Sequence, residues 1–299
     1  MSIGAMGWTP DWVQEALLNH ITGMATFSAP ANHWLALGTA PPSETDRTSW
    51  ANELSGNGYQ RKAIDFSASK TTFVSGSGGN LVSTIRNKCP IFFDQATANW
   101  SGFKYFAIFS AQTGGDLLYW AEYAAAVEGA PAIVVKKSHR LELQACTIEV
   151  HLVKNQTSYG PVTDVCWSKY LQEKVLNLLF RGIGFSAPTN YLCLVYTKPS
   201  PLDSGADLDE PATSKGYART VLGNWDDPTV NSVTLAEIVH TPTVSFPEAT
   251  DDWSVPTFLA VADAATDGNL LYFQDSFPPA GPIEAGDVAT VNSVKVLVS

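Results

Sequence analysis

Phe27-Ser28-Ala29-Pro30 recurs 158 residues later in the chain as Phe185-Ser186-Ala187-Pro188. A second motif, Gly58-Tyr59-x-Arg61, returns at the same offset as Gly216-Tyr217-x-Arg219. Matches that share one offset over a long stretch indicate an internal repeat, and a period of this length indicates a duplicated domain. The sequence therefore predicts a tandem duplication of one module.

The offset shortens toward the end of the module. Gly115-x-Leu117-Leu118-Tyr119 returns as Gly268-x-Leu270-Leu271-Tyr272, 153 residues later. The first copy thus holds five extra residues, and the Ser/Gly-rich stretch Ser75–Asn80 is the predicted place for them, because a loop tip tolerates insertions.

The duplication sets the predicted domain boundaries. A chain of 299 residues is long enough for about two domains. We predict a first repeat at residues 1–153, a linker at residues 154–166 that is rich in Asn, Gly, Pro and Ser, and a second repeat at residues 167–299. Each repeat is long enough to bury its own core without disulfides.

Each copy opens with a predicted amphipathic helix. Apolar residues that recur with a period of 3.6 lie between Pro10 and Gly23 in the first copy and before Gly182 in the second. The residues on these apolar faces are Trp12, Val13, Ala16, Leu17 and Ile21, and Leu171, Val175 and Leu179.

Short apolar or alternating runs bounded by Pro, Gly and Asn predict strands after each helix. In order, these runs are residues 32–39, 103–109 and 117–120, and residues 190–197, 258–262 and 270–273. We therefore predict a mainly β fold with two tandem β-sandwich (jelly-roll-like) domains, each opened by an amphipathic α-helix.

Composition excludes several classes of partner. The formal net charge is -11 and no Lys/Arg stripe is present, so we expect no nucleic-acid partner. No run of 18 apolar residues and no basic amino-terminal region occur, so we expect neither a membrane span nor a classical secretion signal.

Chemical motifs are scarce. The sequence holds no Gly-x-Ser-x-Gly elbow and no phosphate-binding loop, and adjacent carboxylates on a strand would point to opposite faces. The five histidines are not spaced as metal ligands are, and none of them has a histidine at the equivalent position of the other repeat. We expect no catalytic residues, no cofactor and no metal, so the chain is not predicted to be an enzyme.

The four cysteines also lack a site pattern. Cys89, Cys146, Cys166 and Cys193 lie far apart and form no Cys-x-x-Cys pair, which favours free thiols over disulfides or zinc ligands. At the offset of 158, Cys193 aligns with Leu35, so the thiol is not repeated.

Two sets of residues leave alternatives open. The acidic stretch Asp203–Glu210 is a solvated loop or, less simply, a cation site built from oxygen ligands. Trp100 and Trp253 each follow Ala-Thr-x-x, which is typical of core or edge anchors. Together with Trp120 they are also the candidates for surface aromatics that stack on sugars.

The order of the motifs resembles a phage structural module. The segments that carry the resemblance are Ala16–Gly23, Ala29–Pro42, Gly56–Arg61, Phe93–Trp100 and Thr113–Tyr119. Proteins of this kind are known as tail-fibre-like proteins of tailed bacteriophages and usually carry one copy. The resemblance extends over both halves and implies a virion component, although the second copy departs more from the pattern.

The leading hypothesis is a non-enzymatic virion structural protein on the particle surface, either a capsid decoration or cement protein or a tail-fibre or collar component. It would assemble in the bacterial host cytoplasm, dock onto major capsid or tail proteins and form a homo-oligomer. The alternative is a carbohydrate-binding host-receptor adhesin of the phage tail, and a third is a polysaccharide-degrading enzyme.

Overall fold

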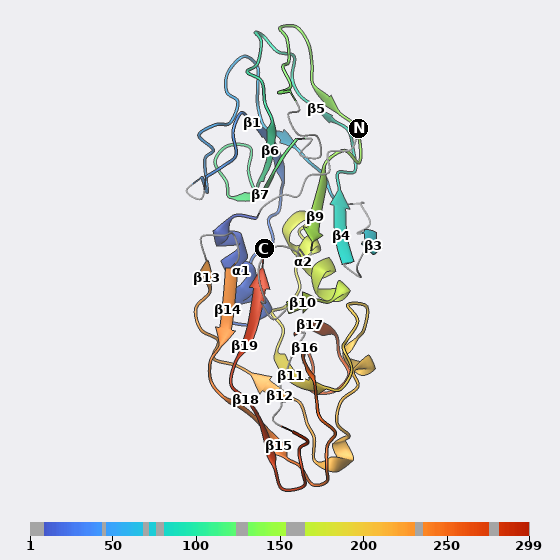
Figure 1. Ribbon diagram of the computed structural model, residues 1–299. Coiled ribbons are helices and arrows are strands. Elements are labelled where there is room, and N and C mark those ends of the chain that lie inside the picture. Colours follow the sequence, from blue (N-terminus) through green and yellow to red (C-terminus); the bar gives the residue numbers. More distant parts are fainter. Residues whose placement is uncertain are drawn as a thin grey trace. The chain divides into compact units, whose positions relative to one another are not determined.

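A computed structural model describes residues 9–43, 46–67, 72–75, 81–123, 131–153, 165–230, 236–274 and 281–298 (Figure 1). Most of the predicted linker, residues 154–164, and most of the predicted insertion, residues 76–80, lie outside these ranges. No helix within the described ranges has both the length and the apolar character needed to cross a membrane.

The fold is mainly β, as the sequence predicts, and the described ranges contain two α-helices. The helices are α1 (Asp11–Ile21) and α2 (Lys169–Arg181), and two short 3-10 helices are η1 (Gly205–Asp207) and η2 (Thr213–Lys215). The strands up to α2 are β1 (Trp34–Gly38), β2 (Lys62–Ala63), β3 (Thr72–Ser75), β4 (Leu81–Arg86), β5 (Ile91–Phe92), β6 (Tyr105–Phe109), β7 (Leu117–Glu122), β8 (Glu142–Leu143), β9 (Glu149–Val153) and β10 (Val165–Trp167). Those after α2 are β11 (Asn190–Val195), β12 (Thr220–Leu222), β13 (Thr229–Val230), β14 (Ala236–His240), β15 (Val244–Glu248), β16 (Phe258–Ala262), β17 (Leu270–Gln274), β18 (Val288–Val291) and β19 (Val294–Val298).

The chain forms two compact units, and neither is continuous in sequence. Unit 1 consists of Met1–Val13, Ser28–Val153 and Val175–Gly184, and unit 2 of Gln14–Phe27, Lys154–Lys174 and Phe185–Ser299. The start of each helix therefore belongs to the unit of its own repeat, and the remainder to the other unit. The compact units cross the predicted boundaries of the repeats, 1–153 and 167–299, and β10 begins inside the predicted linker 154–166. These boundaries describe the repeats in the sequence, and they stay a prediction.

Unit 1 is built on a four-stranded antiparallel sheet in the order β2-β1-β6-β7. Strand β1 pairs with β6 so that Ala36 lies opposite Ala107. Two smaller sheets, β3-β4-β9 and β5-β8, belong to the same unit. The face of β1 and β6 that contains Ala36 and Ala107 packs with Trp50 and Phe109 in one apolar cluster.

Unit 2 repeats this arrangement in a five-stranded sheet with the order β10-β17-β16-β11-β12, beside sheets β13-β14-β19 and β15-β18. Cys193 on β11 lies opposite Ala260 on β16, just as Ala36 lies opposite Ala107. Because Ala107 and Ala260 correspond at the offset of 153, Cys193 corresponds to Ala36. The predicted alignment of Cys193 with Leu35 is therefore wrong by one residue, since the second copy has one residue fewer between Pro188 and its strand.

The predicted helices are confirmed, and their apolar faces are buried. Val13, Leu17 and Ile21 on α1, and Leu171 and Leu179 on α2, are at most 1% exposed. Burial of a Leu or Val side chain of this kind contributes roughly 1.5–3 kcal/mol, so these faces hold the helices more firmly than helix propensity does.

The Gly-Tyr-x-Arg motifs form turns just before β2 and β12. Gly58 has φ +80° and Gly216 has φ +85°, the left-handed conformation that L side chains avoid. The tyrosine that follows each glycine is buried, with Tyr59 9% exposed and Tyr217 4% exposed.

Candidate functional site

Two of the three tryptophans proposed as sugar-stacking residues lie inside the protein. Trp100 is 4% exposed and Trp253 1% exposed, and a stacking platform needs an open ring face. Their indole N–H groups donate to the backbone oxygens of Asn57 and Lys215, at 3.0 and 2.8 Å. This burial favours the alternative interpretation, in which both residues anchor the core.

Trp120 lies in a different environment. It is partly buried on β7, against the apolar cluster of unit 1, with its ring edge-on to Tyr105 at 6.2 Å. Stacking of Trp120 on a ligand stays a prediction.

The clearest polar constellation in unit 1 joins Glu53, Tyr59 and Arg61. The Arg61 guanidinium holds the Glu53 carboxylate with two bonds, Nε to Oε1 at 2.8 Å and Nη2 to Oε2 at 2.6 Å. The Tyr59 hydroxyl donates to Glu53 Oε1 at 3.2 Å and accepts from the Leu37 N–H at 2.8 Å. Arg61 also donates through Nη1 to the backbone oxygen of Gly114, at 2.7 Å, and so ties a hairpin turn to the sheet.

Unit 2 contains the same constellation, made by Glu210, Tyr217 and Arg219. Arg219 Nη2 lies 2.6 Å from Glu210 Oε2, the Tyr217 hydroxyl donates to Glu210 Oε1 at 2.6 Å, and the hydroxyl accepts from Leu194 N–H at 3.1 Å. Arg219 Nη1 reaches the equivalent hairpin turn at the backbone oxygen of Asp267, at 2.8 Å. We call the two constellations the Tyr-Glu-Arg anchors.

The protonation states of the residues in the anchors favour a structural role. Burial, followed by the negative charge of Glu53, raises the pKa of Tyr59 far above its usual value, and burial has the largest share in the same rise for Tyr217. Both phenols are therefore neutral donors over the physiological range of pH. Burial lowers the pKa of Arg219, but its hydrogen bond to Glu210 and the charges around it outweigh burial and raise the pKa overall.

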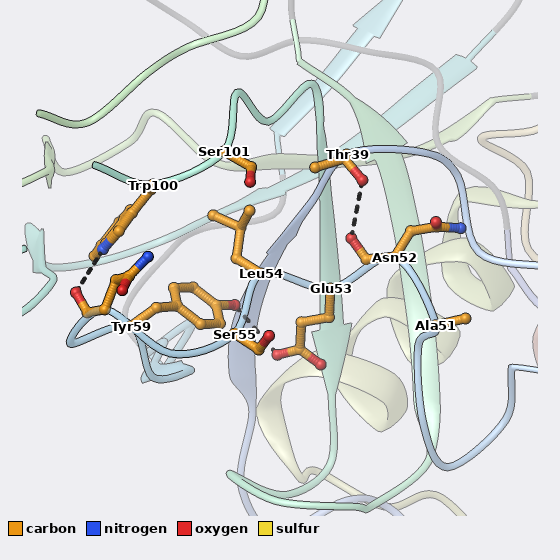
Figure 2. A pocket seen from close by; sticks show the side chains of 10 residues that line it. Thr39, Ala51, Asn52, Glu53, Leu54, Ser55, Tyr59, Trp100 and Ser101 are labelled. Carbon is orange, nitrogen blue, oxygen red and sulfur yellow. Dashed lines mark hydrogen bonds between the residues drawn. The ribbon is translucent and has the colours of Figure 1, made fainter. Parts of the chain in front are cut away.

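Glu53 and Tyr59 also line a polar hollow of about 210 Å³ in unit 1, which Figure 2 shows together with Thr39, Asn52 and Trp100. Three hydrogen bonds join residues drawn there: Thr39 Oγ1 to the backbone oxygen of Asn52, Trp100 Nε1 to the backbone oxygen of Asn57, and the Tyr59 hydroxyl to Glu53. The one carboxylate that lines the hollow, Glu53, is already bonded to Arg61 and Tyr59, an arrangement typical of a structural carboxylate.

The acidic stretch Asp203–Glu210 forms local bonds. Asp203 Oδ2 accepts from the Ser200 N–H, and Asp207 Oδ2 accepts from both the N–H and the hydroxyl of Ser204. The bond from the Ser204 N–H, followed by the bond from its hydroxyl, lowers the pKa of Asp207. Glu210 belongs to the anchor. Among the described residues, no group of three or more His, Cys, Asp or Glu side chains is placed to hold a metal ion.

The cysteines are free thiols in two environments. Cys89 and Cys146 are exposed, whereas Cys166 and Cys193 are buried. Burial raises the pKa of Cys193 well above its usual value, which keeps the thiol protonated and unreactive.

The repeated glutamates were missed by the sequence comparison. Glu53 and Glu210 are 157 residues apart, whereas the tyrosines and arginines beside them are 158 apart. The two copies therefore share an acidic residue at equivalent positions. Aligning Leu35-Ala36-Leu37 with Leu192-Cys193-Leu194 would have revealed the pair, because both strands carry the same apolar alternation.

Comparison with known proteins agrees with the duplication. A family model described as Podophage GP4 fiber I protein gp80 matches residues 9–136 and residues 166–299. One matched region falls on each predicted repeat, and together they confirm the resemblance to phage fibre-like proteins drawn from the ordered motifs. A search of curated proteins gives no significant match.

Proposed function

Since the chain belongs to the family of Podophage GP4 fiber I protein gp80, we propose that it is a non-enzymatic structural protein of a phage virion and a component of the fibre apparatus. The observation that carries this proposal is the match of the family model to both repeats, which together make up most of the chain. Of the locations considered, a fibre or collar position is favoured over capsid decoration or cement because the family is described by a fibre protein.

The internal use of the repeated polar residues supports a scaffold. In both units the glutamate of the anchor is bound by an arginine and a tyrosine, and the repeated tryptophan N–H is bound by a backbone oxygen. A catalytic carboxylate has to reach the proton or atom on which it acts, and these two carboxylates are already occupied. The groups that duplication has kept therefore stabilise turns and sheets.

The protein acts by docking onto other virion proteins. Two like units in one chain can engage two equivalent sites, and the second contact then benefits from the high effective concentration created by the first. Exposed sheet edges are a common docking element for partner strands. The partners are tail or capsid proteins, with further copies of the chain in a homo-oligomer.

Immunogold electron microscopy of virions that carry a short epitope tag at the carboxyl terminus tests the location. We expect gold at the fibres and the tagged chain in purified particles by mass spectrometry. Untagged virions give the background. Gold spread over the head would move the protein to capsid decoration, and absence of the chain from purified particles would overturn the virion proposal.

A further inference from the structure

The end of helix α2 belongs to unit 1, although α2 is part of the second repeat. His33 Nε2 bonds to the backbone oxygen of Leu179, at 2.6 Å. The next residue, Phe180, is buried and packs edge-on against Phe66 at 5.5 Å and Tyr119 at 6.1 Å. Three side chains of the first repeat therefore enclose one turn of a helix from the second repeat.

The end of helix α1 belongs to unit 2 in the same way. Asn190 Nδ2 donates to the backbone oxygen of Ile21, at 2.9 Å. His20 packs edge-on against Phe185 at 4.6 Å, and Gln14 accepts a hydrogen bond from the Ala236 N–H at 3.0 Å. Here it is the second repeat that encloses a helix from the first.

The two sets of contacts are equivalent. Ile21 and Leu179 correspond at the offset of 158. His33 and Asn190 occupy the same place, because each stands two residues before the paired strand residues Leu35 and Leu192.

At the end of each helix, a glycine of one repeat lies close to the backbone of the other repeat. A methyl group on Gly23 would lie 2.9 Å from the backbone oxygen of Pro188, and one on Gly182 would lie 3.3 Å from that of Pro30. Each glycine follows a helix of one repeat and meets a proline of the other. A contact that the chain makes twice, each time between opposite repeats, is a property of the module.

We call the residues that enclose each helix end a seat: His33, Phe66 and Tyr119 in unit 1, and Phe185 and Asn190 in unit 2. We infer that the two repeats form a reciprocal exchange, in which each seat is a docking surface for the helix end of a second copy of the module. The occupants in this chain are Gln14–Phe27 in unit 2 and Val175–Gly184 in unit 1. The chain is a covalently joined exchanged pair, and a single repeat lacks the segment that completes its core. This inference does not depend on the fibre role.

Cross-linking of the full chain tests the exchange. Arg181 Nη2 donates to the Ser67 backbone oxygen at 2.8 Å, so S67C with R181C places two thiols at the seat of unit 1. Exposed Cys89 and Cys146 are first replaced by serine, and a protease site is inserted between residues 158 and 159. After treatment with a short bismaleimide at low protein concentration, cleavage should leave the two fragments joined on a denaturing gel.

A matched pair reports the arrangement without exchange. Met24 lies just beyond the end of α1, and an unexchanged α1 would bring it to the seat beside Ser67. Residues 24 and 67 lie on the same fragment, so the S67C and M24C pair is read by mass spectrometry of peptides, and no cross-link is expected. M24C with T189C, next to the Gly23–Pro188 approach, should join the two fragments through unit 2. A cross-link between residues 24 and 67, or the failure of both exchanged pairs in variants with native circular dichroism, overturns the inference.

Cleavage without cross-linker gives a second readout. The fragments should co-elute in native buffer, and they should separate in denaturant. Two fragments that separate in native buffer while each keeps its near-ultraviolet circular dichroism would also overturn the inference, since each repeat would then be complete by itself.

Discussion

Unit 1 holds a helix end with a histidine, and unit 2 holds one with an asparagine. His33 and Asn190 both bond to a backbone oxygen in the last turn of a helix. The side chains differ, and the sequence offset that aligns the neighbouring motifs does not align these two. Duplication has therefore preserved a donor at a place in space, and the comparison of the units finds it where the comparison of letters does not.

The largest expected effect comes from the Tyr-Glu-Arg anchors. R61M and R219M each leave a partly buried glutamate without the buried arginine that neutralises it, and breaking such an ion pair typically costs about 3–5 kcal/mol of unfolding free energy. Urea denaturation followed by fluorescence measures both. The two variants should lose similar amounts of unfolding free energy, because the side chains of Arg61 and Arg219 are 6% and 4% exposed. A loss under about 1 kcal/mol in either variant would show that the two anchors are not equivalent.

A second prediction divides one helix between the units. Leu171 and Leu179 lie on α2 and are both fully buried, but the first belongs to unit 2 and the second to unit 1. L171A and L179A should each cost about 2–5 kcal/mol through the cavity left behind. Hydrogen exchange should show the greater loss of protection in β16 and β17 for L171A, and in β1 and β6 for L179A. Greater loss in β16 and β17 for both variants would contradict the division of α2.

The tyrosines of the anchors provide a milder comparison. Y59F and Y217F each remove the acceptor for one buried backbone N–H, that of Leu37 or of Leu194. An unsatisfied buried donor costs about 1–3 kcal/mol, so thermal unfolding should shift down in both variants. The double variant should lose the sum, because separate units behave additively. A variant as stable as the parent would indicate that water replaces the hydroxyl.

The smallest effect is an acid sensitivity to which His33 contributes. Burial lowers the pKa of His33, although its bond to the Leu179 oxygen opposes the change. The unfolded chain then binds more protons than the folded chain below about pH 6.5, so stability present above that pH is lost as the pH falls.

Exchanging the two residues separates their contributions. H33N keeps a donor, as Asn190 does, and should reduce the loss of stability between pH 7 and pH 5, while N190H should add to it. His20 in unit 2 also has a pKa lowered by burial, so part of the acid effect remains in H33N. Urea titrations at the two pH values measure the difference, and an unchanged pH dependence in both variants would refute the role of His33.

Much of the fold follows from local pattern. The helices and the main paired strands obey periodicities of 3.6 and 2, and the motif containing Gly58 and Gly216 needs a left-handed turn, so all are readable from sequence. The destination of each helix is not readable in this way. An amphipathic face such as that of Leu171 and Leu179 specifies burial, but it does not say against which repeat.

The candidate site residues show the same distinction between local pattern and tertiary contacts. Trp100 and Trp253 were candidates for both core and surface, because a repeated aromatic residue satisfies either role until burial is known. The equivalence of Glu53 and Glu210 is hidden in the sequence, because a one-residue difference in the preceding loop shifts their spacing from 158 to 157. The pairing of β1 and β11 with their neighbouring strands reveals the correct alignment.

The division of α1 and α2 between the units has a mechanical consequence. In the reciprocal exchange that we infer, tensile force that extends one repeat withdraws the helix end that this repeat contributes to the unit built on the other repeat. The two repeats therefore cannot act as independent links that yield one after the other. A load on either of them is resisted by both cores, and the chain behaves as a single mechanical element.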